Sequence, residues 1–330
     1  MNVLVTGATG FLGKKLAFRL LELGFNVTGI GRNESIGKEL SEHGVTFISC
    51  SLEDRESILS VCKDKDFVFH SGALSSPWGK YNAFYNSNVI GTQNVLDGSK
   101  KAGVKRFIHV STPSLYFHYD ERLNVKEDDL IPNTFVNAYA KTKFLAEQLV
   151  DNAFIDGLPT ITIRPRALFG PGDNAILPRL INVCEKGFFP KMTDDNVLVD
   201  ITYVENVVDA LILCMNSSPE TLGQKYNITN GVQIDLYSVI EDVMKQLGKD
   251  FKYKNLSFKK AFTVARVLEF VSRTVLLGKE PILTKYTVSV LSKSQTLNID
   301  KAKKELGYEP RISIEEGMHN FVEWWKQHEN

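Results

Sequence analysis

The stretch Asn2–Gly24, NVLVTGATGFLGKKLAFRLLELG, contains the change of pattern that decides the fold. Its first residues, NVLVT, form a short apolar and β-branched run, which predicts a buried strand. The residues after Gly10 carry apolar side chains at helical spacing, which predicts an amphipathic helix. Between these two patterns, Gly7, Gly10 and Gly13 occupy the turn and the opening of the helix. This order predicts the start of a βαβ unit.

The same alternation of short strands and longer helices continues through the first half of the chain. The further strand-like runs are NVTGI, VTFIS, DFVFH, RFIHV and TITIR. The alternation predicts an α/β fold, a Rossmann-type doubly wound parallel sheet with helices on both faces. We expect this domain to span residues 1–165, and a smaller, mostly helical substrate lobe to span residues 166–330. For two short strands, VLVDITYV and KYNIT, the sequence leaves open whether they return to the first sheet.

The composition excludes several classes of protein. The chain of 330 residues is 43% hydrophobic, which is enough to fill a large core. Its 39 basic residues balance 39 acidic residues without a long basic run, so neither a nucleic-acid partner nor an anionic-membrane surface has compositional support. Four cysteines without CxxC spacing argue against a zinc site and a disulfide framework. No metal is therefore expected.

We expect neither a signal peptide nor a membrane-spanning helix. The first residues, MNVLVTGATG, enter a strand pattern at once and leave no room for the charged and apolar regions of a signal peptide. The most apolar later stretch, Ala261–Leu277, contains Arg266, Glu269 and Arg273, so it predicts an amphipathic helix instead of a spanning one. A cytoplasmic protein is the resulting expectation.

The glycine turn predicts a dinucleotide site. Glycines at a strand-to-helix turn let the backbone approach a pyrophosphate, whose charge is met by free amide groups at the helix N-terminus. A lone glycine pattern is weak, but here a strand precedes it and an amphipathic helix follows it, as such a site requires. The expected contacts are Gly7, Thr9, Gly10, Phe11, Leu12 and Gly13.

The end of the second predicted strand indicates which dinucleotide is bound. Where an acidic residue would take the ribose hydroxyls of NAD, this sequence reads TGIGRNES, with Gly31 followed by Arg32. An arginine at this place holds the 2′-phosphate of NADP, whereas a carboxylate repels it. NADP(H) is therefore favoured over NAD(H). The alternative is that Arg32 is a solvated loop residue.

A second motif, NAYAKTKFLAEQL over Asn137–Leu149, places Tyr139 and Lys143 four residues apart in a predicted amphipathic helix. Residues at this spacing share one helical face, so the phenol and the ammonium group project into one cleft. Such a pair also arises by chance, and an exposed tyrosine and lysine on a helix face is the alternative. The glycine turn upstream favours the catalytic interpretation.

The order and spacing of these motifs resemble the extended short-chain dehydrogenases/reductases, in the NAD-dependent epimerase/dehydratase superfamily, over essentially the whole chain. The matching segments are TGATGFLG, VFHSGAL, NVIGTQNVL, RFIHVSTPSLY, YAKTK, IRPRALFGPGD, ITYVENVVDA and NIDKAKKELGYEPRISIEEGMHNFVEWW. The resemblance implies that Tyr139 exchanges a proton with the substrate oxygen. It also implies that Lys143 depresses the phenol pKa and holds the nicotinamide ribose.

Elementary electrostatics allows that role for Lys143. A phenol with a pKa near 10 needs a shift of roughly 3 units, about 4 kcal/mol, to act as a base at neutral pH. An ammonium group at ~4 Å in an effective dielectric of ~20 supplies a comparable free energy. We therefore expect Lys143 to lower the pKa of Tyr139.

The resemblance also implies the remaining site residues. The hydroxyl that bonds the substrate oxygen falls on Thr112, with Ser111 and Ser114 as close alternatives. Asn88 either lies near the cofactor or is a buried asparagine that bonds the backbone. Ser51 stands where many relatives place an aspartate against the adenine. The other implied contacts are Leu52, Ser71, Gly72, Ala73, Tyr139, Lys143 and Pro165 for the cofactor, and Trp78, Pro113, Ser114 and Arg166 for the substrate.

Two departures separate the chain from the sugar-nucleotide enzymes that share these motifs. Dehydratases place Asp and Glu just after the active-site threonine, whereas here Pro113 and Ser114 follow Thr112. Sugar-nucleotide enzymes tend to carry an asparagine near the position of Ala167. The segments STPSLYF, IRPRALFGPGDNAILPRL and PILTKYTVSVLSKSQTLNIDKAKKELGY instead resemble the 3β-hydroxysteroid dehydrogenase/isomerase branch, near the bacterial 2-alkyl-3-oxoalkanoate reductases.

We therefore expect an NAD(P)-dependent oxidoreductase that interconverts a ketone and a secondary alcohol on an apolar small molecule, either a β-keto/β-hydroxy acid or a 3-ketosteroid-like compound. The rivals are an NDP-sugar 4-epimerase and a non-catalytic dinucleotide-sensing protein. A homodimer through the helices around Asn88 and Tyr139 is a further expectation. An amphipathic stretch in the second lobe either covers the ligand or packs its own core; its apolar residues are Phe262, Ala265, Val267, Leu268 and Val271.

Overall fold

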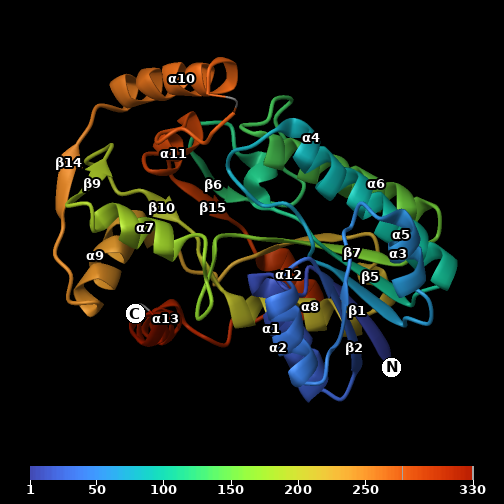
Figure 1. Cartoon of the computed structure of the whole chain (residues 1–330). Coiled ribbons are helices and arrows are strands. Elements are labelled where there is room, and N and C mark those ends of the chain that lie inside the picture. Colours follow the sequence, from blue (N-terminus) through green and yellow to red (C-terminus); the bar gives the residue numbers. More distant parts are fainter. Residues whose placement is uncertain (277, 329–330) are drawn as a thin grey trace.

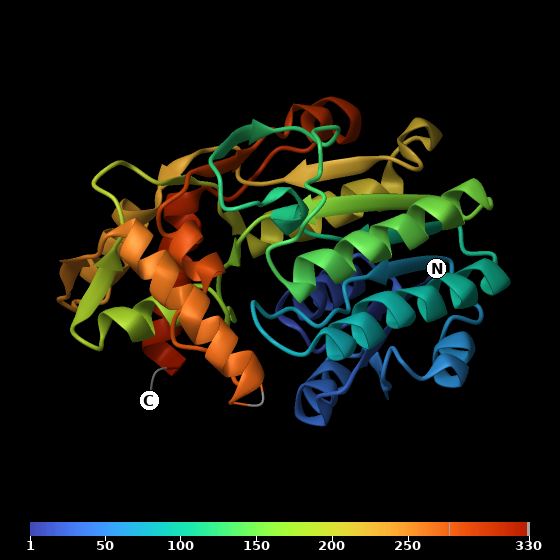
Figure 2. The ribbon, with the colours of Figure 1, turned by 90° about the horizontal axis from the view of Figure 1, so that it is seen from above.

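The larger lobe is built on a parallel seven-stranded sheet, which confirms the predicted Rossmann-type fold (Figure 1 and Figure 2). The computed structural model describes residues 1–276 and 278–328. In spatial order the sheet consists of β12 (Lys225–Ile228), β7 (Thr160–Pro165), β5 (Arg106–Val110), β4 (Phe67–His70), β1 (Asn2–Thr6), β2 (Asn26–Gly31) and β3 (Thr46–Ser49). The order reverses between β1 and β4, and such sheets bind ligands outside the carboxyl ends of the strands at that point.

The first strand shows why this sheet forms the centre of the lobe. Val3, Leu4 and Val5 are each fully buried. Val3 and Val5 belong to one apolar core, and Leu4 belongs to a second core on the opposite face of the sheet. Because successive side chains of a strand point to opposite faces, a continuous apolar run predicts a strand that is covered on both sides.

Helices cover the two faces of the sheet. Their bounds are α1 (Phe11–Glu22), α2 (Glu34–Glu42), α3 (Arg55–Val61), α4 (Tyr81–Phe84), the π-helical segment η1 (Tyr85–Ile90), α5 (Gly91–Ala102), α6 (Ala138–Ile155), α8 (Val204–Asn216) and α12 (Asp300–Leu306). On one face α1 packs against α8, and α8 packs against α12. On the other face α3 packs against α5, and α6 packs against both α5 and η1.

The smaller lobe is mostly helical, and short strands join its parts. Its helices are α7 (Leu177–Cys184), α9 (Leu236–Gln246), α10 (Phe258–Thr274), α11 (Lys285–Val290) and α13 (Ile314–His328). Its main sheet has the order β13 (Ile234–Asp235), β10 (Leu198–Val199), β15 (Gln295–Leu297) and β6 (Arg122–Val125). Two further pairs are β8 (Leu168–Phe169) with β11 (Thr202–Tyr203), and β9 (Phe188–Lys191) with β14 (Lys252–Asn255). Across the described residues, every helix is too short or too polar to cross a membrane.

The chain crosses between the lobes more than once. β6 comes from the first half of the chain but lies in the sheet of the smaller lobe. β12, which contains most of the KYNIT run, pairs in parallel with β7 of the larger lobe. The VLVDITYV run forms β10 and β11, which lie outside the seven-stranded sheet. Both halves of the chain therefore contribute to both lobes.

A buried ion pair joins α6 to β7. The Arg164 guanidinium donates to both carboxylate oxygens of Glu147, at 2.9 Å from Nε and 2.6 Å from Nη2, and both side chains are almost fully buried. Nη1 of Arg164 also donates to the hydroxyl of Tyr116 and to the carbonyl of Glu127. Burial opposes ionisation most strongly, yet the contacts with Glu147 and Tyr116 raise the pKa of Arg164, so the guanidinium stays charged.

Glu147→Leu is expected to lower the free energy of unfolding by about 3–5 kcal/mol, because it leaves the Arg164 guanidinium buried without its counter-charge. The measurement is urea-induced unfolding followed by circular dichroism. The double variant Glu147→Leu/Arg164→Met removes both charges and is expected to recover part of the loss. The control is Asp156→Asn, which breaks the exposed Lys100–Asp156 pair and costs about 1 kcal/mol or less. Equal losses for Glu147→Leu and Asp156→Asn would contradict the role of the buried pair.

Candidate active site

The glycine turn lies at the carboxyl edge of the sheet, where β1 and β4 end. Gly7 has a φ of +68°, and a Cβ atom on it would stand 2.6 Å from the Cα of Gly72. A Cβ atom on Gly13 would stand 2.2 Å from the carbonyl oxygen of Gly7. Side chains are therefore excluded at both positions, and the first amides of α1, which follows Gly10, have no side-chain cap. Free amides at a helix N-terminus favour an anion, so the turn fits a dinucleotide pyrophosphate.

The end of β2 also excludes a side chain. A Cβ atom on Gly31 would stand 2.4 Å from Oγ1 of Thr9, so the threonine fills the space of a residue larger than glycine. A side chain at position 31 would therefore require the Thr9 side chain to move. Arg32 is exposed, and it forms no ion pair within the described part of the chain. Its contact with a 2′-phosphate stays a prediction.

The loops after β3 and β4 border the same edge. Ser71 Oγ donates to the carbonyl of Thr6 at 2.7 Å, and the amide of Gly72 donates to the Thr6 hydroxyl at 3.1 Å. Leu52 packs against Gly72, because a Cβ atom on this glycine would lie 3.0 Å from Cδ1 of Leu52. The structure thus brings Leu52, Ser71 and Gly72 next to the glycine turn, whereas the cofactor contacts of Ser51 and Ala73 stay predictions. Pro165 ends β7, the neighbour of β5.

A chain of buried hydrogen bonds links β1, β4 and η1. Oγ1 of Thr92 donates to the carbonyl of Asn88 at 2.6 Å, so it accepts from Nε2 of His70 at 2.9 Å. Nδ1 of His70 is then the acceptor for the hydroxyl of Thr6 at 2.8 Å. Burial, with a smaller contribution from the charge of Lys143, lowers the pKa of His70 to about 3. The ring is therefore neutral.

The side chain of Asn88 extends this chain to α6. Its oxygen accepts from the amide of Leu74 at 2.7 Å, and its nitrogen donates to the Leu74 carbonyl and to the hydroxyl of Thr142, each at 3.1 Å. This is the geometry of a buried asparagine that bonds the backbone, one of the two interpretations left open by the sequence. The contacts fix the loop after β4 against η1 and α6.

Tyr139 lies in the first turn of α6, which the Asn137 side chain caps. The hydroxyl groups of Thr112 and Ser75 lie close enough to its phenol to lower the pKa. Burial raises the pKa of Tyr139; the two hydroxyls oppose this more weakly, and the nearby Tyr286 adds to it. Tyr139 is therefore a neutral phenol at neutral pH.

Lys143, one turn further along α6, is bonded to β5. Its Nζ donates to the carbonyl of Val110 at 2.7 Å and lies 3.4 Å from Nε2 of His109. Burial lowers the pKa of Lys143 to about 8, although the carboxylate of Glu147 opposes this. The expected depression of the Tyr139 pKa is therefore not what the structure shows. Burial of the phenol is the largest influence on its pKa, and the Lys143 ammonium group is bonded to the backbone of β5.

The end of β5 carries the hydroxyl groups among which the sequence leaves a choice. The Thr112 hydroxyl accepts from the amide of Ser114 and donates to Oγ of Ser114, each at 3.1 Å, and so caps the short 3-10 segment η2 (Pro113–Tyr116). The Ser111 hydroxyl is buried and, within the described residues, has no hydrogen-bond partner. Only Thr112 of these residues contributes a hydroxyl contact to Tyr139, which favours Thr112 for the substrate oxygen.

Arg166 follows β7 and reaches the smaller lobe. Its Nη1 donates to Oε1 of Gln295, whereas Nε of Arg166 and Nε2 of Gln295 are buried without a hydrogen-bond partner among the described residues. Burial lowers the pKa of Arg166, and more weakly Tyr286 and Asp200 raise it. Tyr286 thus lies close enough to influence both Arg166 and Tyr139. No acidic side chain of the described residues forms an ion pair with this guanidinium.

Aromatic side chains line the space next to these groups. The ring centroids of Phe117 and Tyr286 are 5.6 Å apart, those of Phe117 and Tyr119 are 6.1 Å apart, and those of Tyr119 and Phe262 are 5.5 Å apart. We call Phe117, Tyr119, Phe262 and Tyr286 the aromatic wall. The wall leads from the neighbourhood of Tyr139 to the inner face of α10.

The predicted amphipathic stretch is α10, and its apolar residues divide between two sides. Ala265 is fully buried, and Phe262, Leu268 and Val271 are half-buried. Val267, in contrast, is 55% exposed, so it neither covers a ligand in the cleft nor packs the core of the lobe. Leu277, the last residue of the apolar stretch, lies outside the described residues.

Trp78 joins the loop after β4 to the segment that follows α10. Its Nε1 donates to the carbonyl of Gly278 at 3.0 Å. The guanidinium of Arg273 lies over the indole ring, 5.1 Å from its centroid. The role of Trp78 as a substrate contact stays a prediction.

Sequence reasoning missed three residues that lie near Tyr139 or Lys143: Ser75, His109 and Tyr286. His109 carries a signal, because a histidine inside the otherwise apolar run RFIHV predicts a specific polar contact. Ser75 stands in a loop and Tyr286 lies in α11, far along the chain, so neither has a local signal.

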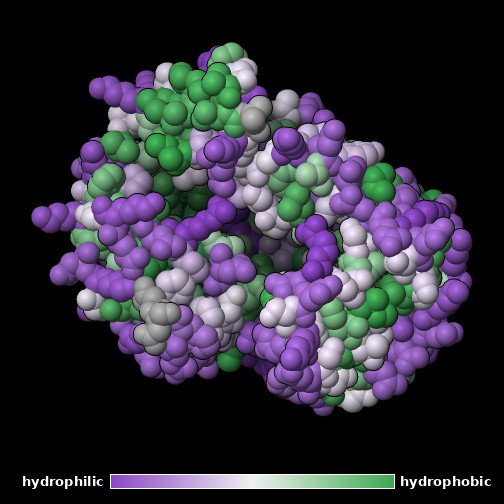
Figure 3. All heavy atoms as spheres, viewed as in Figure 1, coloured by the Kyte–Doolittle hydropathy of each residue, from purple (hydrophilic) through white to green (hydrophobic). Residues whose placement is uncertain are grey.

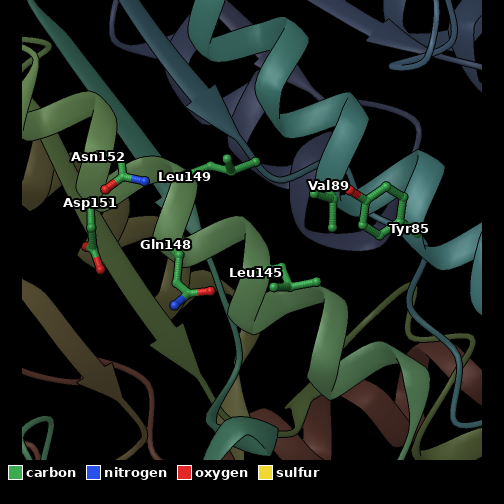
Figure 4. Close-up of a pocket in the computed structure, with 7 residues that line it drawn as sticks. All are labelled: Tyr85, Val89, Leu145, Gln148, Leu149, Asp151 and Asn152. Atoms are coloured by element: carbon green, nitrogen blue, oxygen red, sulfur yellow. The ribbon is translucent and has the colours of Figure 1, made fainter.

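A groove of about 470 Å³ lies between η1 and α6. Figure 4 shows Tyr85 and Val89 of η1 facing Leu145 and Leu149 of α6 across it. Its lining residues are Tyr85, Val89, Leu145, Gln148, Leu149, Asp151 and Asn152. Leu145 and Leu149 project from a different face of α6 from Lys143, so this groove is not the candidate active site. Figure 3 shows that the surface is also hollowed where the two lobes meet.

Comparison with known proteins places the chain in a family. Residues 4–259 match the 3-beta hydroxysteroid dehydrogenase/isomerase family. The chain is 32% identical over 323 residues to the 2-alkyl-3-oxoalkanoate reductase of Stenotrophomonas maltophilia, covering 96% of this chain and 97% of that protein. It is 31% identical over 356 residues to a decarboxylating sterol-4-alpha-carboxylate 3-dehydrogenase of Saccharomyces cerevisiae, covering 98% and 97%.

Among solved structures, the fold is similar to that of UDP-glucuronic acid 4-epimerase from Bacillus cereus in complex with NAD. The TM-score is 0.79 at 23% identity, covering 99% of this chain and 97% of that one. At this identity the likeness shows the fold alone. Together with the family match, it shows that the chain belongs to the 3-beta hydroxysteroid dehydrogenase/isomerase family of extended short-chain dehydrogenases/reductases and is an oxidoreductase.

Proposed function

We propose that the protein reduces the ketone of a β-keto acid with apolar chains, such as a 2-alkyl-3-oxo acid, with NADPH as the hydride donor. The observation that carries the proposal is the neutral phenol of Tyr139, with the Thr112 hydroxyl close to it, at the sheet edge that also holds the glycine turn. A neutral phenol is the form that donates a proton when a carbonyl becomes an alcohol. By their names, the two relatives above act at carbon 3 of molecules that carry a carboxylate.

Each residue of the pair then has a defined task. NADPH supplies the hydride to the carbonyl carbon when it is bound. Tyr139 donates its proton to the carbonyl oxygen, and Thr112 donates a hydrogen bond that orients this oxygen. Lys143, held by Val110 and His109, keeps a cation near the site, where family resemblance assigns it to the nicotinamide ribose.

Arg166 favours an acid over a neutral 3-ketosteroid as the substrate. A desolvated guanidinium without an ion pair is costly, and its remaining donors match a carboxylate in geometry and charge. The unpartnered Nε of Arg166 and Nε2 of Gln295 leave donors for such a group. Because Tyr286 influences both Arg166 and Tyr139, one small substrate can reach both side chains.

The aromatic wall accounts for the apolar part of the substrate. Phe117 is buried, whereas Tyr119, Phe262 and Tyr286 each keep part of their surface accessible. Aromatic and apolar side chains with a few placed polar groups are the usual lining of a small-molecule site. We assign the alkyl chains to this wall and the carboxylate to Arg166.

The cofactor preference, the assembly and the location are parts of the same proposal. NADP(H) is favoured because glycine, with no acidic side chain, stands at position 31 and Arg32 is exposed beside it. We assign the interface of the proposed homodimer to the groove between η1 and α6, where Val89, Leu145 and Leu149 offer apolar surface. The cysteines are free and buried, which supports a reducing, cytoplasmic location.

The rival NDP-sugar 4-epimerase retains one supporting observation, the likeness in fold to a UDP-sugar epimerase. The position where such enzymes tend to carry an asparagine is occupied by Ala167. Ala167 has a φ of +45°, a left-handed conformation that asparagine adopts more readily than alanine. The backbone would therefore accept the amide, but the sequence lacks it.

NADPH is expected to be consumed with 2-alkyl-3-oxo acids, and Tyr139→Phe is expected to lower kcat about a hundredfold or more, because the proton donor is lost. Loss of NADPH absorbance measures turnover, with NADH run in parallel, and fluorescence titration measures cofactor binding. Tyr81→Phe, outside the site, is the control. Epimerisation of UDP-sugars without ketone reduction would move the protein to the rival function. Unchanged turnover in Tyr139→Phe would remove the proposed mechanism.

Arg166→Gln is expected to lower kcat/KM for a 3-oxo acid by about 10- to 100-fold, because a charged hydrogen bond is worth about 1.5–3 kcal/mol. The methyl ester of the same acid lacks the carboxylate and is expected to lose little. Arg166→Lys keeps the positive charge and is the control for the effect of charge alone. Equal losses for acid and ester would show that Arg166 acts on the fold and not on the carboxylate.

The kcat/KM for NADPH is expected to be flat through neutral pH and to fall above about pH 8. Burial lowers the pKa of Lys143 to about 8, so its cation is lost as the pH rises through this value. Tyr139 does not add a second fall there, because its pKa is raised. In Lys143→Arg the side chain stays charged, so the fall is expected to move to higher pH, whatever the absolute rate. An unmoved fall would assign this titration to another group.

A further inference from the structure

Helix α10 carries an apolar stripe on its solvent side. Val264, Val267 and Phe270 are 51%, 55% and 67% exposed, and Val275 and Leu276 continue the exposed apolar surface past the helix end. Figure 3 shows apolar atoms gathered over α10 at the top of this view. Other strongly exposed apolar residues, such as Leu130 in a loop, do not belong to a helical stripe of this kind. Contiguous exposed apolar surface of this kind marks an interaction site.

Basic side chains run along the flank of the same stripe. Lys259, Arg266 and Arg273 recur every seven residues, which is about two helical turns, so they form one row. All three are exposed, as is Lys260 beside them. We call this set the basic row.

The one acidic residue of α10 faces the protein. Glu269 is 7% exposed, accepts from the backbone amide of Lys285 at 2.8 Å and lies 3.6 Å from its Nζ. The outward charge of α10 is therefore entirely positive, although the chain as a whole has a net charge of zero. An exposed apolar stripe with lysines and arginines on its flank is the pattern of a helix that lies in a membrane interface.

The inner face of α10 belongs to the wall of the candidate active site. Phe262 is a member of the aromatic wall through Tyr119. At its end, α10 is joined to the loop after β4 by the contacts of Trp78 with Arg273 and Gly278. A surface bound to the outer face would thus lie one helix diameter from the place assigned to the substrate.

We propose that the outer face of α10 binds the surface of an anionic lipid bilayer. The valines and Phe270 enter the boundary between head groups and acyl chains, and the basic row pairs with lipid phosphates. A second copy of the chain is the less favoured occupant, because it would bring the same basic row and no exposed acid on α10 to pair with it. The binding of α10 to the bilayer does not depend on the proposed function. The further inference that the bilayer supplies the apolar substrate rests on that function.

The test is flotation of the full-length protein with vesicles of phosphatidylcholine alone and of phosphatidylcholine with phosphatidylglycerol. Binding is expected with the anionic vesicles and is expected to weaken at high salt, which screens the basic row. Phe270→Glu is expected to weaken binding about tenfold or more. Lys259→Gln/Arg266→Gln is expected to weaken binding to anionic vesicles by about 10- to 30-fold.

Leu130→Glu is the matched control, because Leu130 is 87% exposed but lies outside α10, and it is expected to leave binding unchanged. Circular dichroism of each variant shows that the fold is intact. Absence of flotation with anionic vesicles, or equal effects of Phe270→Glu and Leu130→Glu, would overturn the proposal. Light scattering without lipid adds a second check, since dissociation of a dimer by Phe270→Glu would assign this face to a second copy. If the protein did not reduce ketones, the flotation results would be unaffected. Failure of the proposed function is therefore distinguishable from failure of the proposed membrane binding.

Discussion

The Arg164 guanidinium makes the contacts on which the geometry of the candidate active site depends. It belongs to β7, binds α6 through Glu147 and binds η2 through Tyr116. α6 carries Tyr139, and η2 follows Thr112 directly, so one buried charge connects the elements that hold both hydroxyl groups. A buried ion pair contributes little net stability compared with apolar packing of the same volume. The contribution of this ion pair is geometric, because a bidentate pair holds β7 and α6 in one relative orientation.

A second constraint concerns how much positive charge this interior can hold. His70 and His109 stack with ring centroids 5.4 Å apart, and burial together with the charge of Lys143 lowers the pKa of both. Both rings are therefore neutral next to a buried ammonium group. A neutral His109 can accept from Nζ of Lys143, whereas a protonated ring would repel it. The neutral histidines thus add no positive charge beside the Lys143 ammonium group.

The fold could be predicted from the sequence because the residues of the glycine turn and of the first strand are compatible with few backbone conformations and environments. Gly7 and Gly13 stand where a Cβ atom would meet backbone atoms, and the apolar run before them is covered on both faces. The sign of the Tyr139 pKa shift was not predictable in this way. Helical spacing places Tyr139 and Lys143 on one face, but it does not determine where the end of a flexible lysine side chain binds. That choice is made by β5, which is distant in sequence and offers the carbonyl of Val110.

The composition of the chain likewise gives its net charge but not where the charged side chains lie. A net charge of zero describes the whole chain, but a charged surface interacts with groups within a Debye length of about 10 Å at 0.1 M salt. Glu269, the one acidic residue of α10, is turned inward. The charge that α10 itself presents to solvent is therefore that of its basic row, which the net charge of the chain does not show. Composition excludes a protein that is basic throughout; it does not exclude a neutral protein that gathers its basic residues on one exposed helix.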